Sequence, residues 1–218
     1  MRYLVFSDSH LTEQFDPKKL TVLKQAITDA DRVIINGDFW DGFSTTFDEF
    51  VSSKWKDTLF PLLKKKKAVY IYGNHDQREY ADKRTSLFCA EEGPHYDIQS
   101  GDKFFHFEHG NRLVPLFDEW FKTRIPPSLN NAYEAVEGFM VRIFGNRYMQ
   151  TMYGKFNKLA VGKLKHEKGL KGYFVMGHTH LKALDHMTKF INTGFIKHGL
   201  AQYIYIEDGT ITQVEKKY

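Results

Sequence analysis

The sequence predicts an α/β fold, and two patterns carry this prediction. In the first half of the chain, short apolar runs alternate with stretches of helical periodicity, which is typical of right-handed crossovers between parallel strands. Further along, pairs of apolar runs flank short polar turns, which is typical of antiparallel hairpins. We interpret these hairpins as a second sheet packed against the first. With 218 residues, the chain is expected to form a single domain (1–218) with one insertion.

The first half contains the expected crossover units. In order, we expect a strand over 1–6, a helix over 17–30, a strand over 32–36, a helix over 48–67, a strand over 68–72 and a short helix over 78–91. Asp16-Pro17 is a plausible start for the first helix. Four lysines, Lys64 to Lys67, end the second helix, where they complement the helix dipole, so we favour this role over nucleic-acid binding.

The second half contains the expected hairpins and one segment without strand character. We expect strands over 96–99, 103–107, 173–176, 189–192, 201–207 and 210–215, with turns at Ser100-Gly101-Asp102 and Asp208-Gly209. Residues 112–172 instead have helical spacing, interrupted by Pro126-Pro127 and Gly145. This helical insertion, or cap, has eleven Lys and Arg against five Asp and Glu, and it therefore carries the basic excess of the chain.

Composition limits the class of protein. Cys89 is the single cysteine, which excludes a disulfide framework and suits a reducing compartment. The short apolar run Met1 to Phe6 leads directly into Asp8, so we interpret it as a strand and not as a signal peptide. No apolar stretch approaches the length of a membrane span. We therefore expect a cytoplasmic protein.

Five of the expected strands end in groups of Asp, Asn or His. These groups are Ser7-Asp8-Ser9-His10, Asn36-Gly37-Asp38-Phe39-Trp40-Asp41, Gly73-Asn74-His75-Asp76, Glu108-His109-Gly110 and Gly177-His178-Thr179-His180. Strand ends that converge at one sheet edge would gather these side chains into a cleft with oxygen and nitrogen ligands for metals. Two neighbouring divalent ions need a bridging ligand, and Asp38 is the natural bridge because a carboxylate has two oxygens.

Taken together and in this order, the five groups resemble the motifs of the calcineurin-like metallophosphoesterase family, over residues 8–180. The resemblance implies a four-layer α/β/β/α sandwich of two mixed sheets with a helical cap insertion at 112–172. It also implies two divalent metal ions, with Mn favoured and Fe, Zn, Co or Ni as alternatives. The implied ligands of one ion are Asp8, His10, Asp38 and His180, and those of the other are Asp38, Asn74, His109 and His178.

The same resemblance implies the roles of the remaining polar residues. His75 would be a catalytic residue that binds no metal and that hydrogen-bonds the phosphoryl oxygen or protonates the leaving group. Asp76 would orient His75 and support its cationic form, and Asp41 would hold a ligand histidine from the second shell of the site. The implied reaction is hydrolysis of a pyrophosphate or phosphodiester bond by a hydroxide shared between the two metals.

A finer resemblance concerns the insertion. The helical segment after His109-Gly110, together with Ile191-Asn192-Thr193-Gly194, is similar to the branch that contains UDP-2,3-diacylglucosamine diphosphatase, where the cap holds acyl chains and a glucosamine phosphate. This implies a phosphate-containing small molecule or a lipid-linked substrate, and peripheral contact of the cap with the inner membrane surface. The implied substrate-binding residues are Asn111, Arg112, Arg124, Arg142 and Arg147. Two positions depart from that branch, which commonly has Arg in place of His75 and an acidic residue in place of Asn111.

Other functions stay open at this point. A general phosphodiesterase, a nuclease or a phosphoprotein phosphatase would use the same chemistry, and a scaffold would have kept the fold and lost catalysis. Nucleic acid is disfavoured because a nuclease should spread positive charge along an open groove, whereas here the charge is concentrated in residues 112–172. The scaffold predicts missing ligands, yet every motif position is filled. The sequence leaves the oligomeric state undetermined.

Overall fold

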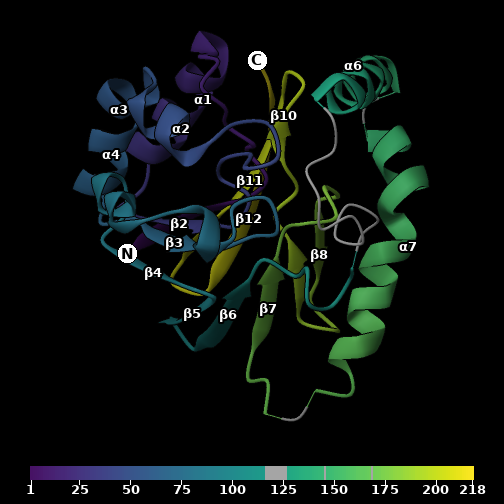
Figure 1. Ribbon diagram of the computed structural model, residues 1–218. Helices are drawn as coiled ribbons and strands as arrows, with labels where there is room; N and C mark the ends of the chain where they lie inside the picture. Colours follow the sequence, from purple (N-terminus) through teal and green to yellow (C-terminus); the bar gives the residue numbers. More distant parts are fainter. Residues whose placement is uncertain (116–126, 145, 168) are drawn as a thin grey trace.

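The computed structural model describes residues 1–115, 127–144, 146–167 and 169–218. Two β-sheets pack face to face, and helices cover the outer face of each sheet (Figure 1). From left to right, Figure 1 shows the helices of the first half of the chain, the first sheet, the second sheet and a long helix of the second half. This arrangement confirms the expected α/β/β/α sandwich of two mixed sheets.

The first sheet has the strand order β10-β11-β1-β2-β3-β4, with β12 paired to β11. Its strands are β1 (Arg2–Phe6), β2 (Arg32–Asn36), β3 (Val69–Ile71), β4 (Glu91–Gly93), β10 (Ile196–Lys197), β11 (Leu200–Glu207) and β12 (Thr210–Lys217). The strands β1 to β4 are parallel, whereas β11 is antiparallel to β1, with Val5 opposite Ile204. The carboxyl-terminal hairpin therefore belongs to the first sheet. Its assignment to the second sheet was wrong, because a hairpin pattern does not determine which strand its edge will pair with.

The second sheet has the strand order β5-β6-β7-β9-β8. Its strands are β5 (His95–Ser100), β6 (Lys103–Glu108), β7 (Tyr173–Met176), β8 (Ala183–Asp185) and β9 (Phe190–Asn192). The pair β5–β6 is the expected hairpin, while β6, β7 and β9 run parallel to one another. The apolar layer between the two sheets is built from Val5, Ile34, Ile71, Phe107, Val175 and Ile191, among others.

Helices of the first half cover the outer face of the first sheet. In α1 (Pro17–Thr28), the Asp16 side chain caps the helix by accepting from the backbone N–H groups of Lys18 and Lys19. Three short helices, α2 (Phe47–Ser52), α3 (Trp55–Thr58) and α4 (Phe60–Lys65), replace the single helix expected over 48–67. The reason is local. Ser53 has an extended backbone with ψ 174° and its hydroxyl donates to the Phe50 carbonyl, so the helix ends there.

Residues 78–91 also depart from the expected helix. They form two 3₁₀ turns, η1 (Arg78–Tyr80) and η2 (Lys83–Leu87), followed by the edge strand β4. The Asp82 side chain interrupts the segment because it accepts from the backbone N–H of Arg84 and so starts a new turn. Short turns of this kind leave the segment close to the loop after β3.

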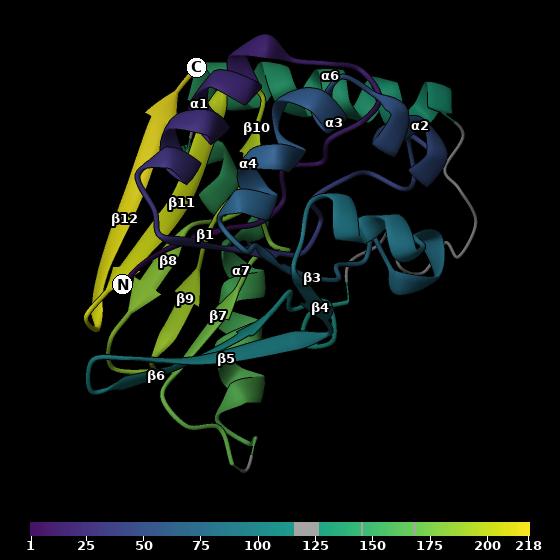
Figure 2. The same ribbon diagram turned by 90° about the vertical axis from the view of Figure 1, so that its left-hand side faces the viewer.

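The segment 112–172 contains the helices α6 (Pro127–Phe144) and α7 (Asn146–Leu164). Helix α7 runs along the outer face of the second sheet, where Ala160 and Phe156 pack against Phe174 and Phe190 (Figures 1 and 2). Helix α6 passes across one end of the sandwich (Figure 2), and its Val141 belongs to a small apolar cluster with residues of β11 and α7. Within the described ranges, no helix is both long enough and apolar enough to cross a membrane.

Candidate metal centre

The five polar motifs meet at one edge of the sandwich. They follow β1, β2 and β3 of the first sheet and β6 and β7 of the second sheet. Backbone hydrogen bonds connect the loops directly, from Asp8 N to Gly37 O at 3.1 Å and from Gly177 N to His109 O at 3.0 Å. Residues separated by more than 160 positions in sequence are thereby held in one buried cluster.

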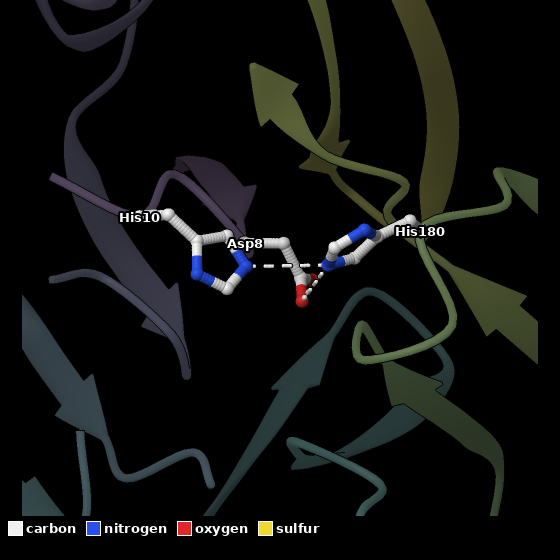
Figure 3. A group of neighbouring side chains, drawn as sticks. All are labelled: Asp8, His10 and His180. Atoms are coloured by element: carbon white, nitrogen blue, oxygen red, sulfur yellow. Dashed lines mark hydrogen bonds and ion pairs between the residues drawn. The ribbon is translucent and has the colours of Figure 1, made fainter. Parts of the chain in front are cut away.

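The first group of ligand atoms comes from Asp8, His10 and His180 (Figure 3). Nε2 of His180 lies 3.2 Å from Oδ1 of Asp8 and 3.2 Å from Nε2 of His10. Figure 3 shows the two imidazoles directed at each other, with the carboxylate beside the line between them. Two imidazole nitrogens and a carboxylate oxygen that converge in this way form a donor set for a divalent transition-metal ion.

The second group comes from Asp38, His109 and His178, whose ligand atoms all lie within 4.8 Å of one another. Nε2 of His109 is 3.2 Å from Oδ2 of Asp38 and 3.1 Å from Oδ1 of Asn74. Asn74 therefore adds an amide oxygen to the three side chains. All four side chains are buried.

Backbone carbonyls orient the two histidines of the second group. The Nδ1 atom of His109 lies 2.9 Å from the carbonyl oxygen of Asn36, and Nε2 of His178 lies 2.7 Å from that of Val114. A proton donated to each carbonyl leaves the other ring nitrogen, Nε2 of His109 and Nδ1 of His178, as a neutral ligand. This arrangement of an outer acceptor and an inner ligand nitrogen is typical of metal sites.

Asp38 belongs to the second group and also approaches His10 of the first group. Its Oδ2 atom is 3.2 Å from Nε2 of His109 and 3.8 Å from Nε2 of His10. Its Oδ1 atom instead accepts from the backbone N–H of His75 at 2.9 Å. The geometry thus places one oxygen of Asp38 between the two groups, while the other oxygen fixes the orientation of the carboxylate.

Backbone strain is concentrated in this cluster. Five of its residues have a left-handed backbone, with φ of 52° at Asp8, 42° at His10, 51° at Asp38, 66° at His178 and 52° at His180. Such a conformation costs about 1–3 kcal/mol for a residue other than glycine, and it persists only where the surrounding structure enforces it. The fold therefore holds these side chains in position at a cost in stability.

Two glycines allow the loops to approach one another. A Cβ atom on Gly37 would lie 2.3 Å from Nδ1 of His109, and one on Gly73 would lie 2.1 Å from Oδ1 of Asp38. Gly37 also has a positive φ of 86°. Any side chain at either position would displace a side chain of the candidate metal centre.

The charges in the cluster favour a bound cation. Burial alone would raise the pKa of Asp38, but His109 and His75 hold this pKa well below its usual value, so the carboxylate is ionised. Burial lowers the pKa of His109, yet the charge of Asp38 outweighs burial and raises it to about 10. Burial and His109 together lower the pKa of His178 to about 4, which keeps that ring neutral. The raised pKa of His109 means that the negative charge of Asp38 stabilises a positive charge at this position, and a divalent ion would supply that charge after displacing the proton of the ring.

The carboxylate beside His75 differs from the expected one. Oδ1 of Asp41 lies 2.9 Å from Nδ1 of His75, whereas the Asp76 carboxylate accepts from the backbone N–H groups of Gly73, Asp38 and Phe39. The expectation that Asp76 orients His75 was therefore wrong, as was the expectation that Asp41 holds a ligand histidine. The loop turns the Asp76 side chain inward, where it fixes the backbones of two motifs.

Four of the five residues expected to bind substrate lie within the described ranges, and these four are dispersed. Asn111 and Arg112 line a cleft beside Asn74, and Arg112 is already paired with Glu108 and Glu167. Arg142 on α6 and Arg147 on α7 are exposed. Arg124 lies outside the described residues. Of the four described residues, the structure brings only Asn111 and Arg112 together, and their role in substrate binding stays a prediction.

The structure adds two residues that the motifs did not indicate. The ring of Phe43 lies 4.2 Å from the ring of His75, centroid to centroid. Lys197 lies on β10, near His10. Burial lowers the pKa of His10 most, and the positive charge of Lys197 lowers it next. Phe43 lies two residues after Asp41, so a search around the motif would have found it. Lys197 had no comparable signal, because its position depends on the pairing of β10 with β11.

Residues 1–182 match the family model described as calcineurin-like phosphoesterase. Among solved structures, the chain is similar to YfcE, a phosphoesterase from E. coli, with 16% identity, a TM-score of 0.53 and coverage of 98% of each chain. It is also similar to a single mutant of Vps29 from Entamoeba histolytica, with 13% identity, a TM-score of 0.49 and coverage of 100% of this chain and 99% of that chain. At 16% identity, the match to YfcE shows the fold alone. No curated protein matches the chain.

Proposed function

This chain belongs to the calcineurin-like phosphoesterase family and is a metal-dependent phosphoric ester hydrolase, and from this premise we propose that it cleaves a pyrophosphate or phosphodiester bond at a centre of two divalent ions. The observation that carries the proposal is the position of Asp38 between two groups of ligand atoms. A centre with a single ion would not need the second group.

The residues present fit such a centre. Asp8, His10 and His180 would hold one ion, and Asn74, His109 and His178 the other, with Asp38 shared between them. Two bound ions would supply Lewis acidity at phosphorus and an activated water for an in-line displacement. Mixed imidazole, carboxylate and amide ligands suit Mn²⁺, which we favour, and also Fe, Zn, Co or Ni.

The chain's own contribution to proton transfer comes from His75. Its ligand atom lies within 4.8 Å of those of His10 and Asp38, so the imidazole faces the space between the two groups. Asp41 stabilises the protonated ring through Nδ1, and this ring would donate a proton to the departing oxygen. Asp76 acts differently, because its hydrogen bonds to three backbone N–H groups hold the loops in place.

The substrate we propose is a phosphate-containing small molecule or a lipid-linked one, such as a UDP-2,3-diacylglucosamine-like compound. The lipid-linked form is supported by α6, where Val136, Phe139 and Ile143 expose 62%, 61% and 55% of their surface at helical spacing. Arg142, which lies between Phe139 and Ile143 in the same helix, is also exposed. An apolar stripe with a neighbouring cation fits an amphipathic anion, and the same stripe would give residues 112–172 peripheral contact with a membrane surface.

The test compares two substrates. Metal-stripped protein is supplied with Mn²⁺ and assayed with bis-p-nitrophenyl phosphate and with a UDP-linked acylated sugar. Preference for the acylated sugar would support the lipid-linked substrate, whereas activity on the diester alone would support the reaction class and overturn the lipid assignment. Absence of Mn²⁺-dependent turnover on both would overturn the proposed function.

A further inference from the structure

A cleft with a volume of about 1340 Å³ opens beside the candidate metal centre. It begins at Gly73 and Asn74 and is bounded by the loop after β2, by η1 and η2, and by residues 108–112. Ligand pockets commonly measure about 300–1,000 Å³, so the cleft has room for a group as large as a nucleotide. Among the side chains that the structure describes, none from α6 or α7 lines it, and none of the stripe residues Val136, Phe139 and Ile143 is part of it.

Aromatic rings form the wall of the cleft nearest to His75. The ring of Phe43 packs against His75 at 4.2 Å between centroids, and both Phe43 and Tyr80 line the cleft. The ring of Tyr80 lies beside Gly42, since a Cβ atom there would be 3.0 Å from Cδ2 of Tyr80. Tyr80 is 42% exposed, so part of the ring is free to contact a ligand. Exposed aromatic rings of this kind provide stacking surfaces for a flat ligand ring.

One cation of the cleft is not committed to a carboxylate. Arg84 pairs with Asp82 and Asp48, and Arg112 pairs with Glu108. Arg78, by contrast, is exposed and forms no ion pair with any residue in the part of the chain that the structure describes. A guanidinium in this state is suited to bind a phosphate oxygen.

The rest of the lining mixes apolar side chains, such as Trp40, Phe47 and Ala81, with polar ones. Gln77 and Asn111 supply amides, and Glu79, Asp48 and Asp82 supply carboxylates. An acyl chain would require a continuous apolar lining, which this mixture does not offer. A nucleoside fits it, because the base stacks on the aromatic rings, the amides hydrogen-bond to base edges and the carboxylates accept from ribose hydroxyls.

We infer that this cleft binds the nucleoside half of a nucleotide-linked substrate, with the base against Tyr80 and Phe43 and a phosphate oxygen on Arg78. The inference rests on the proposed function for the identity of the scissile bond, but the binding itself does not require turnover. The nucleoside would then extend from Asn74 into this cleft, and the other half of the substrate would lie on the other side of the scissile bond.

The test measures binding without catalysis. Mn²⁺-supplied protein is titrated calorimetrically with uridine 5′-monophosphate, with adenosine 5′-monophosphate and with ribose 5-phosphate, which lacks a base. Stacking of a base on an aromatic side chain predicts that at least one of the two nucleotides binds about tenfold more tightly than ribose 5-phosphate. Tyr80→Ala should remove this preference, whereas Arg78→Ala should weaken nucleotide and ribose 5-phosphate alike.

Two matched variants serve as controls. Phe104→Ala removes a ring that is 47% exposed outside the cleft, and Lys83→Ala removes an exposed cation near Arg78 that does not line it. Both should leave all dissociation constants unchanged. Equal affinity for both nucleotides and ribose 5-phosphate, or equal losses in Tyr80→Ala and Phe104→Ala, would overturn the inference. Mn²⁺-dependent turnover of bis-p-nitrophenyl phosphate by the same preparation tests the proposed function separately, so the two failures are distinguishable.

Discussion

Oδ1 of Asp41 lies 2.9 Å from Nδ1 of His75, so the loop after β2 supplies the carboxylate that orients an imidazole from the loop after β3. Burial would raise the pKa of Asp41, but the Coulombic attraction of His75 outweighs burial and holds this pKa below its usual value. The carboxylate is consequently ionised beside the ring. The pair has the geometry of a proton donor supported by a fixed negative charge.

Asp41→Asn tests this pair. The amide can keep a hydrogen bond to His75 but cannot stabilise the positive charge of the protonated ring. We expect kcat for an alkyl phosphodiester to fall about 10- to 100-fold. This loss is smaller than the full contribution of general acid catalysis, because His75 itself is still present. The loss for bis-p-nitrophenyl phosphate should be smaller, because p-nitrophenolate departs without a proton. Equal losses on both substrates would contradict a role of Asp41 in leaving-group protonation.

His75→Ala tests whether His75 is a catalytic residue and not a metal ligand. His75 also forms a candidate group with His10 and Asp38, but the groups of the two proposed ions are complete without it, so we expect the variant to retain its metals. Turnover should fall by about 10²- to 10⁴-fold, which is the usual contribution of general acid catalysis. Metal content measured by mass spectrometry separates the two roles, and loss of metal along with activity would show that His75 is a ligand.

Asn157 of α7 connects that helix to the loop of His178 and His180. Its Oδ1 atom accepts from the Thr179 hydroxyl at 2.6 Å and from Nδ2 of Asn192 at 3.1 Å, and its Nδ2 atom donates to the Leu181 carbonyl at 2.9 Å. Asn157→Leu leaves these buried partners without it and should lower the free energy of unfolding by about 1–3 kcal/mol.

Urea unfolding measures this loss, and hydrogen exchange along 146–164 shows whether α7 loosens. The neighbouring Lys158→Ala alters an exposed side chain of the same helix and should change neither measurement. If the two variants behaved alike, the contacts of Asn157 would not be what holds α7 on the sheet.

Glu137 of α6 predicts a dependence of stability on pH. Its carboxylate is buried, and it accepts from the Tyr153 hydroxyl at 2.8 Å and lies 3.1 Å from Nε2 of His198. Burial raises the pKa of Glu137, but the hydrogen bond from His198 and nearby positive charges lower it well below its usual value. Because the folded pKa lies below the unfolded value of about 4.3, the stabilisation is present above that pH and is lost as the pH falls further.

Glu137→Gln should therefore be less stable than the parent chain at pH 7 by about 1–3 kcal/mol, and the difference should shrink below about pH 4. Urea unfolding at several pH values measures the difference. Glu13→Gln, at an exposed position, should show no such convergence. A difference that stays constant from pH 7 to pH 3 would contradict the ionised, buried state of Glu137.

Much of the fold was predictable because its signals are local. An apolar run followed by Asp, Asn or His identifies both a strand and its functional end, as at β1 with Asp8 and β7 with His178. The partner of β11 was not predictable in this way, since Val5 and Ile204 lie opposite each other across nearly the whole chain. The break after Ser52 depends on one side-chain hydrogen bond of Ser53, which helical periodicity does not reveal.

In the candidate site, too, some features were predictable from the sequence and others were not. The positions of the motifs indicated which residues would gather, and the structure brings Asp8, Asp38 and His109 together with their partners. The pairing of carboxylates depends instead on where each loop turns its side chain. Asp76 follows His75 in sequence, whereas Asp41 contacts it in space. Because the Asp76 carboxylate accepts from backbone N–H groups, Asp41 is the partner of His75.

The central claim is a centre of two divalent ions that share Asp38. The most direct measurement is a titration of metal-stripped protein with Mn²⁺, with bound metal and turnover of bis-p-nitrophenyl phosphate followed together in the parent chain and in Asp38→Asn. The account predicts two bound equivalents with turnover that depends on both in the parent chain, and weakened binding with no turnover in the variant. Near-normal turnover of Asp38→Asn with both metals retained, or full activity of the parent chain with one equivalent, would contradict it.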